Sequence, residues 1–167
     1  MNFVNASIFV HMSAKVIWIG VRPERKAPVQ SRTEVYADRE DGLTGDHPTQ
    51  PHRQVTLISQ EAMEEVARIL KLEKADPAKT RRNMLIEGLN LSLSSGDQLR
   101  IGGAIIEITG PCLPCSRMDE TFGNGGQLAM AEAGGFTGRI LTSGNIRLGD
   151  RVEMVRKDMP ASMTNGL

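Results

Sequence analysis

The sequence predicts a single mainly β domain, built as a partly closed β-barrel with one or two covering helices. Short segments rich in β-branched or alternating apolar residues recur between turn residues, which is typical of many short strands. Only one segment carries a long apolar stripe at helical spacing. The 167 residues suffice for one domain with a core and are too few for two domains of ordinary size. Many short strands with few helices favour a barrel.

The first third of the chain predicts strands separated by a long loop. Residues 14–21 (AKVIWIGV) are rich in β-branched side chains and are followed by two prolines, which predicts a buried strand. A weaker strand is expected at residues 31–37 (SRTEVYA). Residues 38–54 (DREDGLTGDHPTQPHRQ) have no periodicity and predict a long loop, and such loops in compact domains are usually functional or disordered. A short strand is expected at residues 55–58 (VTLI).

A helix is predicted directly after this strand. Ser59 can cap residues 60–73 (QEAMEEVARILKLE), because its hydroxyl can accept a hydrogen bond from a free N–H of the first turn. We expect the helix to cover one side of a sheet. The apolar stripe that would face the sheet consists of Ala62, Met63, Val66, Ile69 and Leu70.

The C-terminal half predicts further strands and one short helix. Residues 81–90 (RRNMLIEGLN) predict a strand and a turn. Residues 99–110 (LRIGGAIIEITG) and 146–155 (IRLGDRVEMV) match each other at a constant offset, and each is expected to form a hairpin around a glycine-containing turn. Both hairpins are expected in one sheet. Between them, residues 122–136 (FGNGGQLAMAEAGGF) predict a short helix bracketed by glycines.

Composition excludes several classes of partner. The chain has 20 Lys and Arg against 20 Asp and Glu, so no overall field attracts nucleic acid or an anionic membrane. Only 4% of the residues are aromatic, which leaves few stacking platforms for single strands. Residues 1–13 fit neither a signal peptide nor a membrane span, and we expect them to be a leader or disordered because the strand pattern begins only near Lys15. Residues 14–160 would form the domain and 161–167 a tail, in a cytoplasmic protein.

The segment "GPCLPCSRMDE" holds both cysteines of the chain, Cys112 and Cys115. Two buried apolar thiols are one interpretation. A thioredoxin-like redox pair is a second, but it needs a βαβ context, whereas hairpins are predicted here. A third is a zinc site that adds His47 and His52, although two prolines lie between these histidines. The fourth is a lone reactive thiolate at Cys115, favoured by the guanidinium two residues further on.

Several arginines lie on predicted loops or strand ends. Arg81 and Arg82 directly precede Asn83, which makes a set of donors suited to phosphate or a planar heterocycle. We expect an anion pocket between these residues and the loop from Asp46 to Arg53, with Asp46 orienting the bases, since a carboxylate repels phosphate. The candidates are Arg53, Arg81, Arg82, Arg117 and Arg139.

Two adjacent glycines, Gly134 and Gly135, have two possible roles. They would allow a ligand to approach the backbone. Alternatively, they end the short helix that precedes them.

An ordered set of motifs resembles the MOSC domain, named for the C-terminal part of molybdenum cofactor sulfurases. The motifs are "GLTGDHP", "RQVTLIS", "RRNMLIEGLNL", "GDQLRIGGAIIEITGPCLPCSRMDE", "GGFTGRIL" and "SGNIRLGD", and they run from about Gly42 to Val155. The resemblance implies a β-rich, barrel-like fold with a pocket for molybdenum-molybdopterin. It also implies that Cys115 ligates the metal and is catalytic, with Cys112 as an accessory. The cofactor-binding residues would be His47, Arg53, Arg81, Asn83, Arg117 and Arg139.

The resemblance implies a reductase of N-hydroxylated compounds, acting on a small-molecule substrate. Two cysteines cannot hold an iron–sulfur cluster alone, so a separate flavoprotein or ferredoxin would have to deliver electrons. Two alternatives stay open. One is a sulfur carrier that forms a persulfide on Cys115, with Cys112 able to resolve it as a disulfide. The other is a cofactor-binding module without catalytic activity.

Overall fold

The computed structural model describes four segments of the chain, residues 14–47, 50–89, 92–131 and 133–155. The predicted leader (1–13), the last residues of the predicted domain (156–160) and the predicted tail (161–167) lie outside the described residues. None of the helices within those segments has the length and apolar character needed to cross a membrane.

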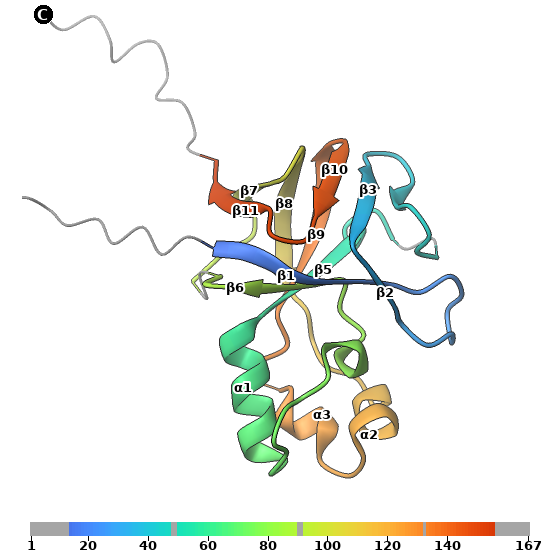
Figure 1. The fold of residues 1–167 in the computed structure, drawn as a ribbon, viewed down its shortest axis with the longest axis vertical. Coiled ribbons are helices and arrows are strands. Elements are labelled where there is room, and N and C mark those ends of the chain that lie inside the picture. Colours follow the sequence, from blue (N-terminus) through green and yellow to red (C-terminus); the bar gives the residue numbers. More distant parts are fainter. Residues whose placement is uncertain (1–13, 48–49, 90–91, 132, 156–167) are drawn as a thin grey trace, which may run out of the picture.

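Seven strands form a closed barrel (Figure 1). They are β1 (Ala14–Val21), β5 (Val55–Ser59), β6 (Met84–Glu87), β7 (Gln98–Ile101), β8 (Ala104–Pro111), β9 (Phe136–Thr142) and β11 (Arg151–Met154). Their spatial order is β11, β7, β8, β9, β5, β6 and β1, and the ring closes because β1 also pairs with β11. The mainly β barrel class is confirmed, with complete rather than partial closure.

Apolar side chains fill the barrel, and β8 shows the alternation that places them there. Ala104, Ile106 and Ile108 are fully buried, whereas Ile105 and Glu107 between them are partly exposed. This period of two is what a strand needs to present one face to a core. β-branched side chains dominate the interior, because they fit a pleated surface with little loss of rotamer freedom.

Neighbouring barrel strands are antiparallel except β5 and β6, which are parallel and joined through helix α1 (Gln60–Ile69). A parallel pair needs such a crossover. The predicted cap is confirmed, since the Ser59 hydroxyl accepts a hydrogen bond from the Ala62 amide at 3.0 Å. The predicted stripe is wrong at Ile69, which is 44% exposed at the last turn, and Ala67 is buried instead.

The other helices lie beside α1 at one end of the barrel (Figure 1). They are the 3-10 helix η1 (Pro77–Thr80), α2 (Arg117–Phe122) and α3 (Gly126–Ala129). The glycine-bracketed helix α3 was predicted, whereas α2 was not. Met63, Met118 and Met130 form part of a second core beneath these helices. This end of the molecule carries the cysteine segment.

A small three-stranded sheet consists of β10 (Gly144–Arg147), β3 (Glu34–Asp38) and β4 (Gly42–Leu43). The remaining strand, β2 (Gln30–Arg32), extends the barrel sheet beside β1. The predicted strand at 31–37 is therefore divided between β2 and β3, and β4 lies inside the predicted long loop.

One predicted hairpin is confirmed and the other is wrong. β7 and β8 pair directly around their turn, with Ile101 opposite Ala104. Residues 146–155 do not form a hairpin, because β10 pairs with β3 while β11 pairs with β7 and β1. The turn between β10 and β11 bonds to other segments: the Gly149 amide donates to the Val16 carbonyl at 2.8 Å. The chain therefore leaves one sheet and enters the other at this turn.

Candidate functional site

A cavity of about 650 Å³ lies among four segments that end or begin secondary structure. One segment follows β1, one precedes β5, and one joins η1 to β6. The fourth carries the cysteines and leads into α2. Cys115, His47 and His52 line the cavity. Arginines dominate the rest of the lining: Arg22, Arg25, Arg53, Arg81, Arg82 and Arg117.

The two cysteines have different environments. Cys115 is exposed and lines the cavity, whereas Cys112 is only 2% exposed and packs in the interior. Both thiols are free. The amide of Cys112 donates to the Gly135 carbonyl at 2.8 Å, which fixes the start of the segment. The buried-thiol interpretation therefore describes Cys112, and only Cys115 is presented to the cavity.

Arg82 anchors the cysteine segment from behind. Its side chain is 3% exposed and donates to three carbonyl oxygens, those of Gly134 (2.7 Å), Thr80 (3.1 Å) and Cys112 (3.2 Å). Burial lowers the pKa of Arg82, and the neighbouring Cys112 opposes that shift. A buried guanidinium needs hydrogen-bond acceptors to be tolerated, and here a backbone carbonyl accepts from each of its three nitrogens.

The glycines at 134 and 135 serve this same anchoring. A Cβ atom on Gly134 would collide with the Cys112 carbonyl oxygen, and one on Gly135 would collide with the Leu57 carbonyl oxygen. Gly135 also has a φ of +85°, which favours glycine. These glycines allow the close approach of the protein's own backbone, so the expectation that they admit a ligand is corrected.

Arg22 lines the cavity and has one buried donor to spare. Its buried Nε atom has no hydrogen-bond partner among the described residues. Burial lowers the pKa of Arg22, Asp46 opposes the shift, and nearby Arg81 and Arg53 add to it. The site therefore holds a partly desolvated cation among like charges, which is the condition that an anion would relieve.

Arg81 and Arg117 line the same cavity as Cys115. Both guanidinium groups donate to the Arg25 carbonyl oxygen, at 2.9 Å from Arg81 and 3.2 Å from Arg117. Arg81 has a left-handed backbone with φ of 59°, which is strained for a residue with a side chain. Burial lowers the pKa of Arg81, and the charge of Arg117 lowers it further.

A comparison of the sequence with known domain families identifies the family of this chain. The MOSC domain family matches residues 44–153, which include most of the cavity wall and the whole cysteine segment. The chain belongs to the MOSC domain family. No curated protein matches the chain in sequence.

Solved structures show the same fold for this MOSC domain. The YuaD protein of Bacillus subtilis superposes with a TM-score of 0.75 at 16% identity, over 86% of this chain and 96% of that one. YiiM of Escherichia coli gives 0.66 at 21% identity, over 86% and 70% of the two chains. YiiM of Geobacillus stearothermophilus gives 0.71 at 17% identity, over 89% and 78%. At these identities the similarity concerns the fold alone.

The cavity of this MOSC domain brings together five of the seven residues that the resemblance implies for the metal and cofactor: Cys115, His47, Arg53, Arg81 and Arg117. It also contains two further candidates from the sequence, His52 and Arg82. The remaining two of the seven, Arg139 and Asn83, lie outside its lining. Arg139 is exposed on β9, pairs with Glu107 at 2.7 Å and lines a different cavity.

Asn83 lies behind the cavity wall rather than in its lining. Its Oδ1 atom accepts hydrogen bonds from the Thr56 amide and hydroxyl, both at 3.0 Å, and its Nδ2 atom donates to the Gly20 carbonyl at 3.1 Å. Nδ2 also lies 3.4 Å from Asp46 Oδ2, while Asp46 Oδ1 accepts from the Arg22 amide at 2.7 Å. Asn83 and Asp46 thus hold the backbone that carries Arg22.

Sequence reasoning missed Arg22 and Arg25. Both follow directly on the first predicted strand, in "VRPER", and this position at a strand end was the available signal. The sequence does not show that these arginines lie near the cysteine segment. Arg117, which donates a hydrogen bond to the Arg25 carbonyl, follows Arg25 by 92 residues.

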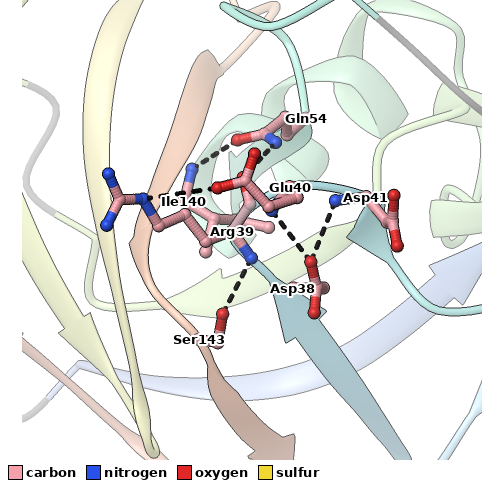
Figure 2. Close-up of polar contacts among 7 residues, drawn as sticks. All are labelled: Asp38, Arg39, Glu40, Asp41, Gln54, Ile140 and Ser143. Carbon is pink, nitrogen blue, oxygen red and sulfur yellow. Dashed lines mark hydrogen bonds and ion pairs between the residues drawn. The ribbon is translucent and has the colours of Figure 1, made fainter.

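A polar network fixes the end of the loop that carries His47 and Arg53 (Figure 2). The buried side chain of Gln54 donates to the Arg39 carbonyl at 2.9 Å and accepts from the Ile140 amide at 2.8 Å. The Arg39 amide donates to the Ser143 hydroxyl at 2.8 Å. The loop therefore enters β5 from a position that is tied to both the small sheet and β9.

The zinc interpretation finds little geometric support. His47 and His52 line the same cavity as Cys115, but Cys112 is buried on the interior side. Throughout the described segments, no three His, Cys, Asp or Glu side chains are grouped so that they could hold a metal ion. A metal at Cys115 would therefore need ligands other than the side chains of the described residues.

Proposed function

We propose that this MOSC domain binds molybdenum-molybdopterin in the arginine-lined cavity, with Cys115 as the protein ligand of the metal, and reduces N-hydroxylated compounds. One observation carries the proposal. The exposed thiol of Cys115 shares a cavity with six arginines, one of which has a buried, unpartnered Nε atom.

The residues present fit this group in charge and in donor type. A thiolate is a soft ligand suited to a thiophilic metal. Guanidinium groups bind phosphate through paired N–H donors, and the orphaned Nε of Arg22 is such a donor. A single protein ligand also agrees with a metal whose other ligands come from a pterin rather than from side chains.

The protein's residues would bind the cofactor, orient the substrate and keep water out of the cavity. Arg22 and Arg53 would hold phosphate, while Cys115 fixes the position of the metal. The bound group would supply the chemistry that removes oxygen from a weak N–O bond. His47 and His52 line the cavity and could pass a proton to the substrate. Leu113, which is 70% exposed at the cavity, would exclude water once a substrate covers it.

Electrons would come from a separate protein. Two cysteines cannot hold an iron–sulfur cluster, and one of them is buried. We therefore expect a flavoprotein or a ferredoxin as electron donor, and a small molecule as substrate. The protein would then be the terminal component of a short electron-transfer chain.

The test is metal content and turnover in matched cysteine variants. Protein purified from a host that makes molybdenum cofactor should contain molybdenum and should reduce amidoximes or N-hydroxylated bases with reduced methyl viologen. Cys115→Ser should lose both properties, whereas Cys112→Ser should keep them. Loaded protein that reduces none of these compounds, together with a persulfide on Cys115, would favour the sulfur-carrier function instead. Equal loss in both variants would indicate a dithiol.

A further inference from the structure

Two leucines at the helical end of the barrel are the most exposed large apolar side chains of the described residues. Leu113 is 70% exposed and Leu128 is 79% exposed, whereas the other large apolar side chains in those segments are at most 47% exposed. Leu113 directly follows Cys112, which is buried. Leu128 lies in α3, where Ala129 is buried instead. The neighbouring side chains pack inside, and the two leucines face solvent.

The two leucines belong to one apolar surface beside the arginine-lined cavity. Leu113 lines that cavity, and Pro114 directly after it lines a neighbouring hollow of about 390 Å³ together with Leu128 and Ala131. We call Leu113, Pro114, Leu128 and Ala131 the apolar patch. Single exposed apolar side chains are normal, but a contiguous group beside a functional cavity indicates contact with another molecule.

Cations lie on the cavity side of the apolar patch. Six arginines and, among the described residues, no Asp or Glu line the cavity that Leu113 borders. Arg25 and Lys26 are exposed on the loop after β1. Arg81 and Arg117 donate to the Arg25 carbonyl at 2.9 and 3.2 Å, which fixes this loop against the start of α2. Helix α2 in turn lies beside α3 (Figure 1).

Fewer acids lie at this end of the molecule. In the described residues of the loop after β1 and from the cysteine segment through α3, the acids are Glu24, Asp119 and Glu120. Asp119 lines the hollow of the patch, and its Oδ1 atom accepts a hydrogen bond from the Gln127 amide at 2.9 Å. Because the whole chain has equal numbers of cations and anions, the cation excess here makes this face positive relative to the rest.

We infer that the apolar patch and the cations beside it form the docking surface for an acidic redox carrier protein, which delivers electrons to the cavity. The role of the partner as electron donor rests on the proposed function. Leu113 stands two residues before Cys115, so a carrier that covers it approaches the proposed metal ligand, and electron transfer is fast only over short distances. Complexes of this kind are small, often below about 1,200 Å², so a patch of a few apolar side chains suffices.

Charge selects an acidic partner over a second copy of the chain. Two copies joined through this face would bring their cations together, which like charges disfavour. A cofactor phosphate would offset Arg22 and Arg53 inside the cavity, whereas Arg25 and Lys26 are exposed and would still be available to a partner. Acidic groups around the redox centre of the carrier would pair with them.

The electron balance fixes how often the carrier docks. Reduction of one N–OH group to N–H and water takes two electrons from the carrier and two protons from solvent. A ferredoxin, which carries one electron, would therefore dock twice per turnover, and a fully reduced flavodoxin could supply both electrons.

Docking is tested with the full chain and three purified carriers, an acidic plant-type ferredoxin, an acidic flavodoxin and a basic cytochrome c. An NMR titration at about 20 mM NaCl should show binding of an acidic carrier that weakens at about 300 mM NaCl, and no binding of cytochrome c. Leu128→Ser should weaken binding about tenfold, because it removes an apolar contact. Leu148→Ser changes a leucine that is 44% exposed on the turn between β10 and β11, and this control should bind like the wild type.

Charge reversal tests the cations separately. Arg25→Glu should weaken binding of the acidic carrier about tenfold, and Lys26→Glu repeats the test in case Arg25→Glu does not fold. Arg100→Glu, on the exposed face of β7, is the control that should not change binding.

Turnover separates docking from chemistry. Leu128 lies outside the lining of the arginine-lined cavity, so loaded Leu128→Ser should keep its rate with reduced methyl viologen. With the reduced acidic carrier, its rate should fall about tenfold at carrier concentrations below saturation.

Three results of the titration would overturn the docking surface: no binding of either acidic carrier at low salt, equal binding by wild type and Leu128→Ser, or tighter binding of cytochrome c. Self-association in sedimentation experiments that Leu128→Ser abolishes would overturn it in favour of a second copy. Absence of turnover with methyl viologen would instead overturn the reductase function. The titration alone then decides whether this face binds an acidic protein.

Discussion

The guanidinium of Arg82 donates to the carbonyl oxygen of Cys112 at 3.2 Å, although 30 residues separate the two in sequence. This bond joins the start of β6 to the segment that presents Cys115. Because Arg82 also binds the carbonyls of Thr80 and Gly134, one buried side chain determines where three segments meet. The position of the exposed thiol thus depends on a residue whose side-chain hydrogen bonds all go to backbone carbonyls.

Arg82→Met should destabilise the protein and loosen the cysteine segment. The substitution leaves three buried carbonyl oxygens without their donor, and we expect a loss of roughly 2–4 kcal/mol in the free energy of unfolding. Urea unfolding measures it. Arg100→Met removes an exposed arginine and should change stability by less than about 0.5 kcal/mol. Equal stability of the two variants would show that the three bonds contribute little.

Thiol reactivity should separate the two cysteines. Cys115 is exposed and Cys112 is 2% exposed, so the folded protein should react with one equivalent of an aromatic disulfide reagent and the unfolded protein with two. Cys115→Ala should remove the fast phase completely. A fast phase of two equivalents in the folded protein would contradict the buried position of Cys112.

Arg22 should destabilise the free protein and stabilise the anion-bound protein. Its pKa is lowered chiefly by burial, so the folded state disfavours the charged form, which is the form present at neutral pH. Arg22→Met should therefore raise the melting temperature of the free protein by roughly 1–3 °C. It should also reduce the stabilisation that phosphate gives to the wild type. Arg100→Met is again the control, and a lower melting temperature for free Arg22→Met would contradict the argument.

Local signals in the sequence predicted the elements that depend on neighbouring residues. The Ser59 cap and the hairpin at 99–110 follow from hydroxyl placement and a glycine turn, and both are confirmed. The hairpin expected at 146–155 failed because the partners of β10 and β11 are strands more than forty residues away in the chain, and apolar alternation does not identify a partner.

Only part of the candidate site could be predicted from the sequence. Sequence motifs indicated Arg53, Arg81 and Cys115, which the fold gathers in one cavity. Arg22 and Arg25 were missed because an arginine after a strand is usually solvated, and only the closed barrel brings them opposite the cysteine segment. Gly135 was expected either to admit a ligand or to end a helix, and the backbone that approaches it is the protein's own, at Leu57.

Gly135→Ala should be far more damaging than Gly149→Ala, although both glycines have nearly the same backbone conformation. Their φ angles are +85° and +87°, so each alanine pays a similar conformational cost of about 1–2 kcal/mol. A Cβ atom on Gly149 meets nothing within 4 Å, whereas one on Gly135 collides with the Leu57 carbonyl oxygen in β5.

Because β5 is a central barrel strand, the clash must be relieved by moving the segment that contains Gly135. That movement breaks the bond from the Cys112 amide to the Gly135 carbonyl, now 2.8 Å long. We therefore expect Gly135→Ala to lose more than about 3 kcal/mol of unfolding free energy and to make Cys112 reactive toward thiol reagents, while Gly149→Ala does neither beyond its conformational cost. Urea unfolding and thiol counting on the two variants provide the measurement, and equal losses would mean that the glycine at 135 is required for its backbone angle alone.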